Sequence, residues 1–305
     1  MLYLQLTLIT SLGVLFLMLR LTLNEERNML AYLLGIVLAV IASFTWAVSP
    51  ILYRVGATDS ALDDLISNSL GAFILAMPFI LLKPPLNGGA WLYGTLFAVL
   101  GPVFGTYVFL ISLRYADVGI ANVISYAYVV MLPIILLVIS PSYLVYTWPA
   151  ILIMIGLYLI MGSGKGTFYG YFMSLLSAIL YAFSFLALYR AYDYTNPWGI
   201  ILIRGITLMI GALLLKIAIE GFRIRVSSKV FLGGLISYGV GGPLYVLSVD
   251  YAGIAVPTLI TALSPVITEI LAIVKLKERL NLKSSLGFAI VIIGIVIATL
   301  IGVQV

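Results

Sequence analysis

Cysteine and histidine are both absent from the 305 residues of this chain. Without cysteine there is no disulfide framework and no thiol redox chemistry, and without histidine the commonest metal ligand and proton shuttle near neutral pH is missing. Charge is scarce as well, because Asp, Glu, Lys and Arg together make up 9% of the residues. So few charges cannot cover the surface of a water-soluble domain of this size. The chain is therefore expected to lie in a lipid bilayer.

Long apolar runs take the place of charge, and 63% of the residues are hydrophobic. A helix needs about 20 apolar residues to cross a bilayer, and these runs are apolar on every face, which predicts helices rather than a barrel. An extra apolar stretch, Leu2 to Leu19, lies in the N-terminal segment 1–28, which we interpret as an additional span, a signal, or a segment ahead of a native start at Met29. The ten main spans are expected at residues 30–53, 64–82, 91–113, 119–140, 145–162, 168–189, 198–217, 231–248, 254–275 and 284–302.

The basic residues, which give a net charge of +5, are interpreted as signals of membrane orientation. They stand singly between spans or in two loops at the membrane edge, a distribution that does not favour nucleic acid as a partner. Most of them fall on one side when the spans are counted alternately. The positive-inside rule then predicts a multi-pass protein of the cell membrane with the loop 275–283 in the cytoplasm.

The chain repeats itself at a constant offset of 136 residues. Five spans, an odd number, precede the second copy, so this copy begins on the opposite side of the membrane and the two halves are inverted relative to each other. We expect the first five-helix repeat at residues 30–162 and the second at 168–302, joined by the glycine-rich loop 162–167. The matching positions are Tyr53-Arg54 with Tyr189-Arg190, Ile74 with Ile210, Ala76 with Ala212, Gly105 with Gly241, Ser112 with Ser248, Tyr115-Ala116 with Tyr251-Ala252 and Ile124 with Ile260.

Several short motifs stand in a fixed order along the chain, and the segment in spans three and four has a counterpart in spans eight and nine. They are Leu110 to Asn122 in spans three and four, Tyr245 to Pro257 in spans eight and nine, Leu263-Ser264-Pro265, Trp46-Ala47 late in span one, Arg204 in span seven, and Glu278-Arg279 followed by Gly287 and Gly294. In this the chain resembles the EamA-like members of the drug/metabolite transporter superfamily. The apolar runs and this resemblance together predict an all-α membrane protein with a ten-helix core of two inverted five-helix repeats and an extra N-terminal helix. The resemblance implies alternating-access transport of a small solute. The sequence contains no nucleotide-binding motif, and no cofactor is expected.

Two charged residues inside apolar spans are candidates for a functional role. A carboxylate at the bilayer centre costs about 2.5 to 3.5 kcal/mol, so Glu269 is interpreted either as a proton- or cation-coupling group or as a buried structural partner. Arg204 is interpreted either as the anchor of an anionic substrate group or as a side chain that reaches to the interface. Asn68, its counterpart in the first half, is a further candidate for substrate binding.

Aromatic and hydroxyl side chains are frequent on the spans that this architecture places around a central cavity. They are candidates for substrate binding, although aromatic residues at helical spacing also serve in packing and at membrane interfaces. Gly101-Pro102, Gly105 and Gly239 to Pro243 interrupt spans three and eight at corresponding places, which favours a moving gate or close helix packing. The aromatic and hydroxyl candidates are Trp46, Ser49, Tyr107, Ser125, Tyr126, Tyr128, Tyr181, Ser184, Tyr245, Thr261 and Ser264.

Asp59, Asp63 and Asp64 form an acidic group that could suggest a metal site. Their spacing instead favours Asp59 or Ser60 as the cap of span two, and Thr195 to Pro197 provide the same signal at span seven. No second acidic group completes a metal site in the sequence, so no metal is predicted.

The predicted function is secondary transport of a small organic metabolite or amphipathic compound, for example in amino-acid export. A sugar-phosphate-type exchanger is one alternative, which would need several cations in the cavity where Arg204 alone is evident. A membrane protein that binds lipid or a partner without transport is the other. Catalysis is not expected, because an intramembrane enzyme needs a convergent acid, base or metal set.

Overall fold

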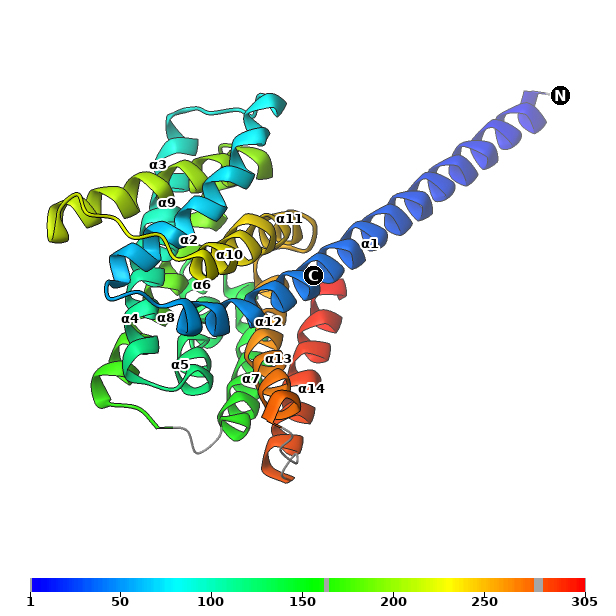
Figure 1. The fold of residues 1–305 in the computed structure, drawn as a ribbon. Helices are drawn as coiled ribbons and strands as arrows, with labels where there is room; N and C mark the ends of the chain where they lie inside the picture. Colours follow the sequence, from blue (N-terminus) through cyan, green and yellow to red (C-terminus); the bar gives the residue numbers. More distant parts are fainter. Residues whose placement is uncertain (1, 162–164, 277–281, 305) are drawn as a thin grey trace.

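The computed structural model describes residues 2–161, 165–276 and 282–304, with side chains from Asn28 onward except at 272–276 and 304. The regular elements in these ranges are helices, and Figure 1 shows them gathered into one bundle. The first half contains α1 (Leu2–Gly56), α2 (Ala61–Ala76), η1 (Met77–Leu82), α3 (Gly88–Ala98), η2 (Val99–Gly105), α4 (Thr106–Tyr115), α5 (Val118–Ser125), α6 (Tyr128–Leu136), η3 (Pro141–Tyr146) and α7 (Thr147–Ile160). The second half contains α8 (Phe168–Ala191), α9 (Pro197–Glu220), α10 (Ser228–Gly234), η4 (Leu235–Gly241), α11 (Gly242–Ala252), α12 (Ala255–Ile260), α13 (Leu263–Leu276) and α14 (Leu282–Gln304).

The predicted ten-helix core is confirmed. Nine stretches in the described part of the chain are long and apolar enough to cross a membrane, and the shorter apolar stretch Ala255–Leu271 supplies the tenth. Five of these precede the loop 162–167 and five follow it. The N-terminal residues are helical, as expected, but they continue into the first span as part of α1. The sequence between Val14 and Leu34 contains neither glycine nor proline to end a helix there.

Two helix starts follow the predicted capping signals. The Ser60 side chain accepts hydrogen bonds from the backbone amides of Leu62 and Asp63, at 3.1 and 3.3 Å, and so caps α2. Asn196 caps α9 in the same way, accepting from the Gly199 amide at 3.1 Å with Pro197 in the first turn. Each cap provides acceptors for amides that have no partner within the helix.

The third span of each half contains a π-helical segment. These segments, η2 and η4, cover Val99–Gly105 and Leu235–Gly241, which correspond residue by residue at the offset of 136. Both fall where glycine and proline interrupt the apolar run. The fourth span of each half is also broken, between α5 and α6 and between α12 and α13. The two halves thus depart from regular α-helix at corresponding places.

Small residues allow close contact between the last spans of the two halves. Figure 1 shows α7 and α14 lying along each other. A Cβ built on Gly156 would lie 2.8 Å from the carbonyl oxygen of Gly287, and one built on Gly287 would lie 2.7 Å from that of Gly156. The glycines therefore let the two backbones touch, as is common between membrane helices.

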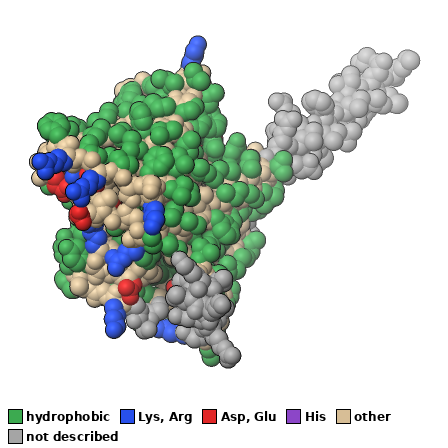
Figure 2. Space-filling view, in the orientation of Figure 1, with side chains coloured by type: hydrophobic (Ala, Val, Ile, Leu, Met, Phe, Trp, Pro, Cys, Tyr) green, Lys and Arg blue, Asp and Glu red, His purple; other side chains and the backbone are tan. Residues whose placement is uncertain are grey.

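Apolar side chains cover most of the flank seen in Figure 2, whereas most charged side chains on that face gather at one edge. This distribution fits a bundle surrounded by lipid. The predicted hinge loop 162–167 and the loop 275–283, which contains Glu278 and Arg279, lie largely outside the described residues.

Candidate functional site

A cavity of about 100 Å³ lies between the two halves. Its wall side chains are all buried or half-buried. The volume is smaller than the roughly 300–1,000 Å³ of typical ligand pockets, so the structure shows the site in a contracted state. The wall comprises Trp46, Ser49, Pro50, Tyr53, Phe97, Pro102, Thr106, Phe109, Asn122, Ser125, Tyr126, Tyr128, Tyr181, Ser184, Phe185, Arg204, Ser237, Tyr238 and Tyr245.

The structure brings many of the predicted substrate-binding candidates together on this wall. They come from both halves, so the two halves form the wall together. Those on the wall are Trp46, Ser49, Ser125, Tyr126, Tyr128, Tyr181, Ser184, Arg204 and Tyr245.

The remaining candidates lie behind the wall or away from it. Asn68 accepts a hydrogen bond from the Tyr53 hydroxyl at 2.8 Å, and the hydroxyl of Thr261 lies 2.8 Å from that of Tyr128. Ser264 is fully buried and Tyr107 half-buried, and neither lines the cavity.

Glu269, the candidate coupling residue, is half-buried on α13 and does not line the cavity. One of its carboxylate oxygens lies 3.6 Å from the position of a Cβ built on Gly119, in the first turn of α5. A carboxylate near a helix N-terminus is electrostatically favourable. The residue thus bridges the fourth spans of the two halves, and its part in coupling stays a prediction.

Arg204 on α9 is the charged residue of the wall, and its side chain is 3% exposed. One guanidinium nitrogen, Nη2, donates to the carbonyl oxygen of Tyr238 at 2.5 Å. The Nε atom has no partner, and no carboxylate lies within ion-pair distance of the guanidinium, among the residues that the structure describes. Burying a charge without a counter-ion costs on the order of several kcal/mol, even after the surrounding protein has relaxed. The guanidinium thus keeps unused donor capacity among the described residues, and the ring of Tyr238, whose centroid lies 5.8 Å from Cζ, offers it a cation–π contact.

The Tyr238 carbonyl is free to accept because of the local helix geometry. In the π-helical register of η4 the amide of Gly242 donates to the Ser237 carbonyl, five residues back. The next donor in that register would be residue 243, which is a proline and has no N–H. Arg204 donates to the Tyr238 carbonyl in place of the missing backbone amide. The irregular helix around Pro243 therefore also determines where the cation is held.

Hydroxyl groups cluster beside this cation. The hydroxyls of Thr106, Tyr181 and Tyr238 form a triangle with separations of 2.5, 3.1 and 3.1 Å. A second group joins Tyr53 to Ser237, whose hydroxyl oxygens lie 2.6 Å apart. These hydroxyls can donate or accept, so this part of the cavity offers polar contacts that adapt to a ligand.

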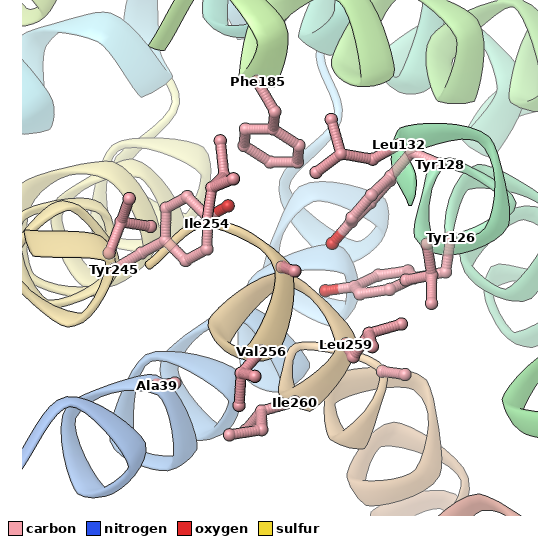
Figure 3. Close-up of a cluster of buried hydrophobic side chains, with 14 of the residues drawn as sticks. Ala39, Tyr126, Tyr128, Leu132, Phe185, Tyr245, Ile254, Val256, Leu259 and Ile260 are labelled. Atoms are coloured by element: carbon pink, nitrogen blue, oxygen red, sulfur yellow. The ribbon is translucent and has the colours of Figure 1, made fainter. Parts of the chain in front are cut away.

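Aromatic rings form much of the rest of the wall. Ring centroids are 5.3 Å apart for Trp46 and Tyr245, and 5.1 Å apart both for Tyr245 and Phe185 and for Phe185 and Tyr128. Figure 3 shows Phe185 between Tyr245 and Tyr128, with Tyr126 next to Tyr128. Edge and tilted contacts at these distances are favourable for aromatic pairs. The wall thus combines a hydroxyl group cluster beside Arg204 with a continuous set of aromatic rings.

Sequence reasoning missed several wall residues, among them Tyr53, Thr106, Asn122, Ser237 and Tyr238. The internal repeat could have identified some of the wall residues, because in some pairs related by the offset of 136 both members line the cavity. These pairs are Ser49 with Phe185, Pro102 with Tyr238, and Phe109 with Tyr245.

We expect Gly242→Ala to displace the Arg204 guanidinium. A Cβ built on Gly242 would lie 2.6 Å from Cζ of Arg204, while the helical backbone itself accepts alanine. Overpacking of this kind lowers the free energy of unfolding by about 1–3 kcal/mol. Denaturant unfolding in micelles checks it, with the same change in an Arg204→Gln background, where the cost should fall below about 0.5 kcal/mol. Equal costs in both backgrounds would contradict the contact.

Comparisons with known proteins agree with this architecture. The profile of the EamA-like transporter family matches residues 33–162 and, a second time, residues 168–300. An uncharacterized transporter from Archaeoglobus fulgidus is 26% identical over 278 residues, which cover 88% of this chain and 99% of the relative. A solved crystal structure has a TM-score of 0.66 over 87% of this chain and 96% of its own, at 14% identity, which shows a shared fold. Because the family profile accounts for most of the chain in two copies, this protein belongs to the EamA-like transporter family and is a multi-pass membrane protein.

Proposed function

We propose that the protein carries a small organic metabolite across the membrane by alternating access, with the central cavity as its solute site. The observation that supports this is a cavity lined by buried residues of two inverted halves, with separate contacts between the halves on its two sides. A carrier of this kind opens one end at a time while the site stays fixed between the halves.

At one end the halves are joined by an ionic latch, which we define as Asp63, Asp64, Arg114, Lys216 and Glu220. Lys216 on α9 lies 2.7 Å from Asp63 on α2 and 2.7 Å from Glu220, and its side chain is 4% exposed. Arg114 at the end of α4 pairs with Asp64. The latch ties the start of α2, in the first half, to the end of α9, in the second half.

At the other end the halves are joined by uncharged contacts. The Asn87 amide donates to the Tyr194 carbonyl at 3.0 Å, and the Thr195 hydroxyl donates to the Pro85 carbonyl at 2.6 Å. Phe79 stacks on Trp198 with a centroid separation of 5.2 Å. Phe79 and Asp63 lie at opposite ends of the span Ala61–Leu82, so these contacts and the latch lie on opposite sides of the cavity.

The sugar-phosphate alternative fits this cavity poorly. A phosphate group carries close to two negative charges and is usually held by several cations. The cavity wall contains one cation, Arg204, among the described residues. A metabolite with at most one negative charge fits better.

A lipid- or partner-binding protein without transport is distinguished by access from the two sides. The chain has no cysteine, so Ser184→Cys places a single thiol on the cavity wall. We expect this thiol to react with a membrane-impermeant reagent from either side of oriented vesicles, because each end opens in turn. Ile155→Cys, whose native side chain is 47% exposed on the outer flank of α7, should react from neither side. Reaction of the cavity thiol from one side alone would contradict alternating access.

A further inference from the structure

We propose that the solute is a small organic acid with one carboxylate group, and that Arg204 is its anion site. This inference rests on the carrier function proposed above and names the substrate class of the same cavity. It follows from three properties of the wall: an unpaired buried donor, the charge balance and the aromatic surface.

The unpaired donor is the first property. The Nε atom of Arg204 is buried without a partner in the described part of the chain, and the guanidinium makes its hydrogen bond to Tyr238 through Nη2. Nitrogens of a guanidinium are donors only, so the missing partner must be an acceptor. The planar donor fork matches the two oxygens of a carboxylate.

A second unpaired donor lies close behind the wall. The amide nitrogen of Asn68 is buried without a partner among the described residues, although its oxygen accepts from Tyr53. Asn68 and Arg204 occupy equivalent positions in the two repeats, and their helices α2 and α9 pack together. At this equivalent position the first half thus contributes a hydrogen-bond donor but no charge.

The charge balance is the second property. Among the described wall residues, Arg204 is the one that carries a formal charge at neutral pH. A monocarboxylate would leave the cavity neutral, whereas a doubly charged phosphate would leave an unpaired negative charge in an apolar enclosure. An ammonium group would find no carboxylate on this wall. The balance therefore favours a monocarboxylate over a phosphate ester, an amine or a zwitterionic amino acid.

The aromatic surface of the wall is the third property, because it limits the rest of the solute molecule. Trp46, Tyr245, Phe185 and Tyr128 present ring surfaces there, and the hydroxyls of Tyr245 and Tyr128 are engaged by Thr258 and Thr261 outside the wall. The volume is about 100 Å³, compared with about 150 Å³ for an engineered cavity that admits benzene. In this contracted state the site fits a body of a few carbon atoms.

The test is thermal stabilisation of the purified full-length protein by a matched series with a four-carbon body. The probes are butyrate, butyramide, 2-aminobutyrate, butylammonium and butyl phosphate, at equal concentration and ionic strength. A ligand that binds only the folded state stabilises it by RT ln(1 + [L]/Kd), so at equal concentration the rise in melting temperature ranks the probes by affinity. We expect butyrate to bind most tightly and Arg204→Gln to weaken it by at least about 30-fold. Arg204→Lys, which keeps the charge but not the fork, should weaken it less.

Arg190→Gln is the matched control, because it removes an exposed arginine that lies off the cavity wall. It should change butyrate affinity by no more than about twofold. Should Arg204→Gln fail to fold, Gly242→Ala keeps the charge while displacing the guanidinium, and it should also weaken butyrate binding. Equal binding of butyrate and butyramide, tighter binding of any other probe, or no effect of either variant would overturn the anion site.

Failure here is separable from failure of the carrier function. Labelling of Ser184→Cys from both sides depends on the motion of the halves and on no particular solute. Two-sided labelling together with a preference for butyramide or butylammonium would leave the carrier intact and remove the carboxylate assignment.

Discussion

Lys216→Met is expected to lower the free energy of unfolding by about 3–5 kcal/mol, because it leaves a buried carboxylate without its partner. The Asp63 side chain is 6% exposed and lies 2.7 Å from the Lys216 ammonium, which is itself 4% exposed. Methionine has a similar length and good helix propensity, so the loss reports the charge and not the packing. Denaturant unfolding of the purified protein in micelles measures it.

The double variant Asp63→Asn with Lys216→Met is the control. Replacing both charges of a buried pair is often neutral, whereas removing one is costly. We expect the double variant to regain most of the lost stability. If the double variant were as unstable as Lys216→Met, the side chain and not the ion pair would be the source of the loss.

The same double variant provides a readout of gating. The ionic latch closes the cavity at the end where α2 begins and α9 ends, so its neutralisation should favour the state open at that end. The thiol of Ser184→Cys should then react faster from that side and more slowly from the other. Unchanged rates on both sides would show that the latch serves stability alone.

Gly71→Ala is expected to lower the free energy of unfolding by an amount near the upper end of overpacking effects, about 3 kcal/mol. A Cβ on Gly71 would lie 2.7 Å from Cα of Leu235 and 2.9 Å from the carbonyl carbon of Gly234. Both are backbone atoms, which cannot move aside as a side chain can. The contact joins α2 of the first half to the junction of α10 and η4 in the second.

Gly88→Ala provides the matched control, because a Cβ there meets nothing within 4 Å. Gly88 opens α3 directly after the Asn87 cap, and alanine should change the free energy of unfolding by no more than about 0.5 kcal/mol. The comparison is made by thermal and denaturant unfolding of both variants. Similar losses would show that the cost comes from the lost glycine and not from the helix crossing.

The ten spans were predictable because each apolar run is long enough to cross a bilayer and each is closed by polar or capping residues. Ser60 and Asn196 illustrate this, since their capping role needs only neighbours within three residues. The breaks after Ser125 and after Ile260 were not predictable, because the apolar runs continue through them. Periodicity carries no signal where every face of a helix is apolar.

Contacts between residues far apart in the sequence could not be predicted from the sequence alone. Lys216 stands within an apolar span, and nothing nearby indicates that it pairs with Asp63 in the other half. The contact between Arg204 and the Tyr238 carbonyl depends on the π-helical register around Pro243, which composition alone does not specify. The aromatic candidates reached the wall because their spans surround the cavity, and their roles in binding stay predictions.

The π-helical segments also bear on the history of the chain. A π-helical turn accommodates one more residue than an α-helical turn and rotates everything after it about the helix axis. Both halves contain this excess in the same turn of the same span, at Val99–Gly105 and Leu235–Gly241. A single extra residue present before the gene segment was duplicated accounts for both. The ancestor with five helices would then already have possessed the irregular turn around which the cavity is built.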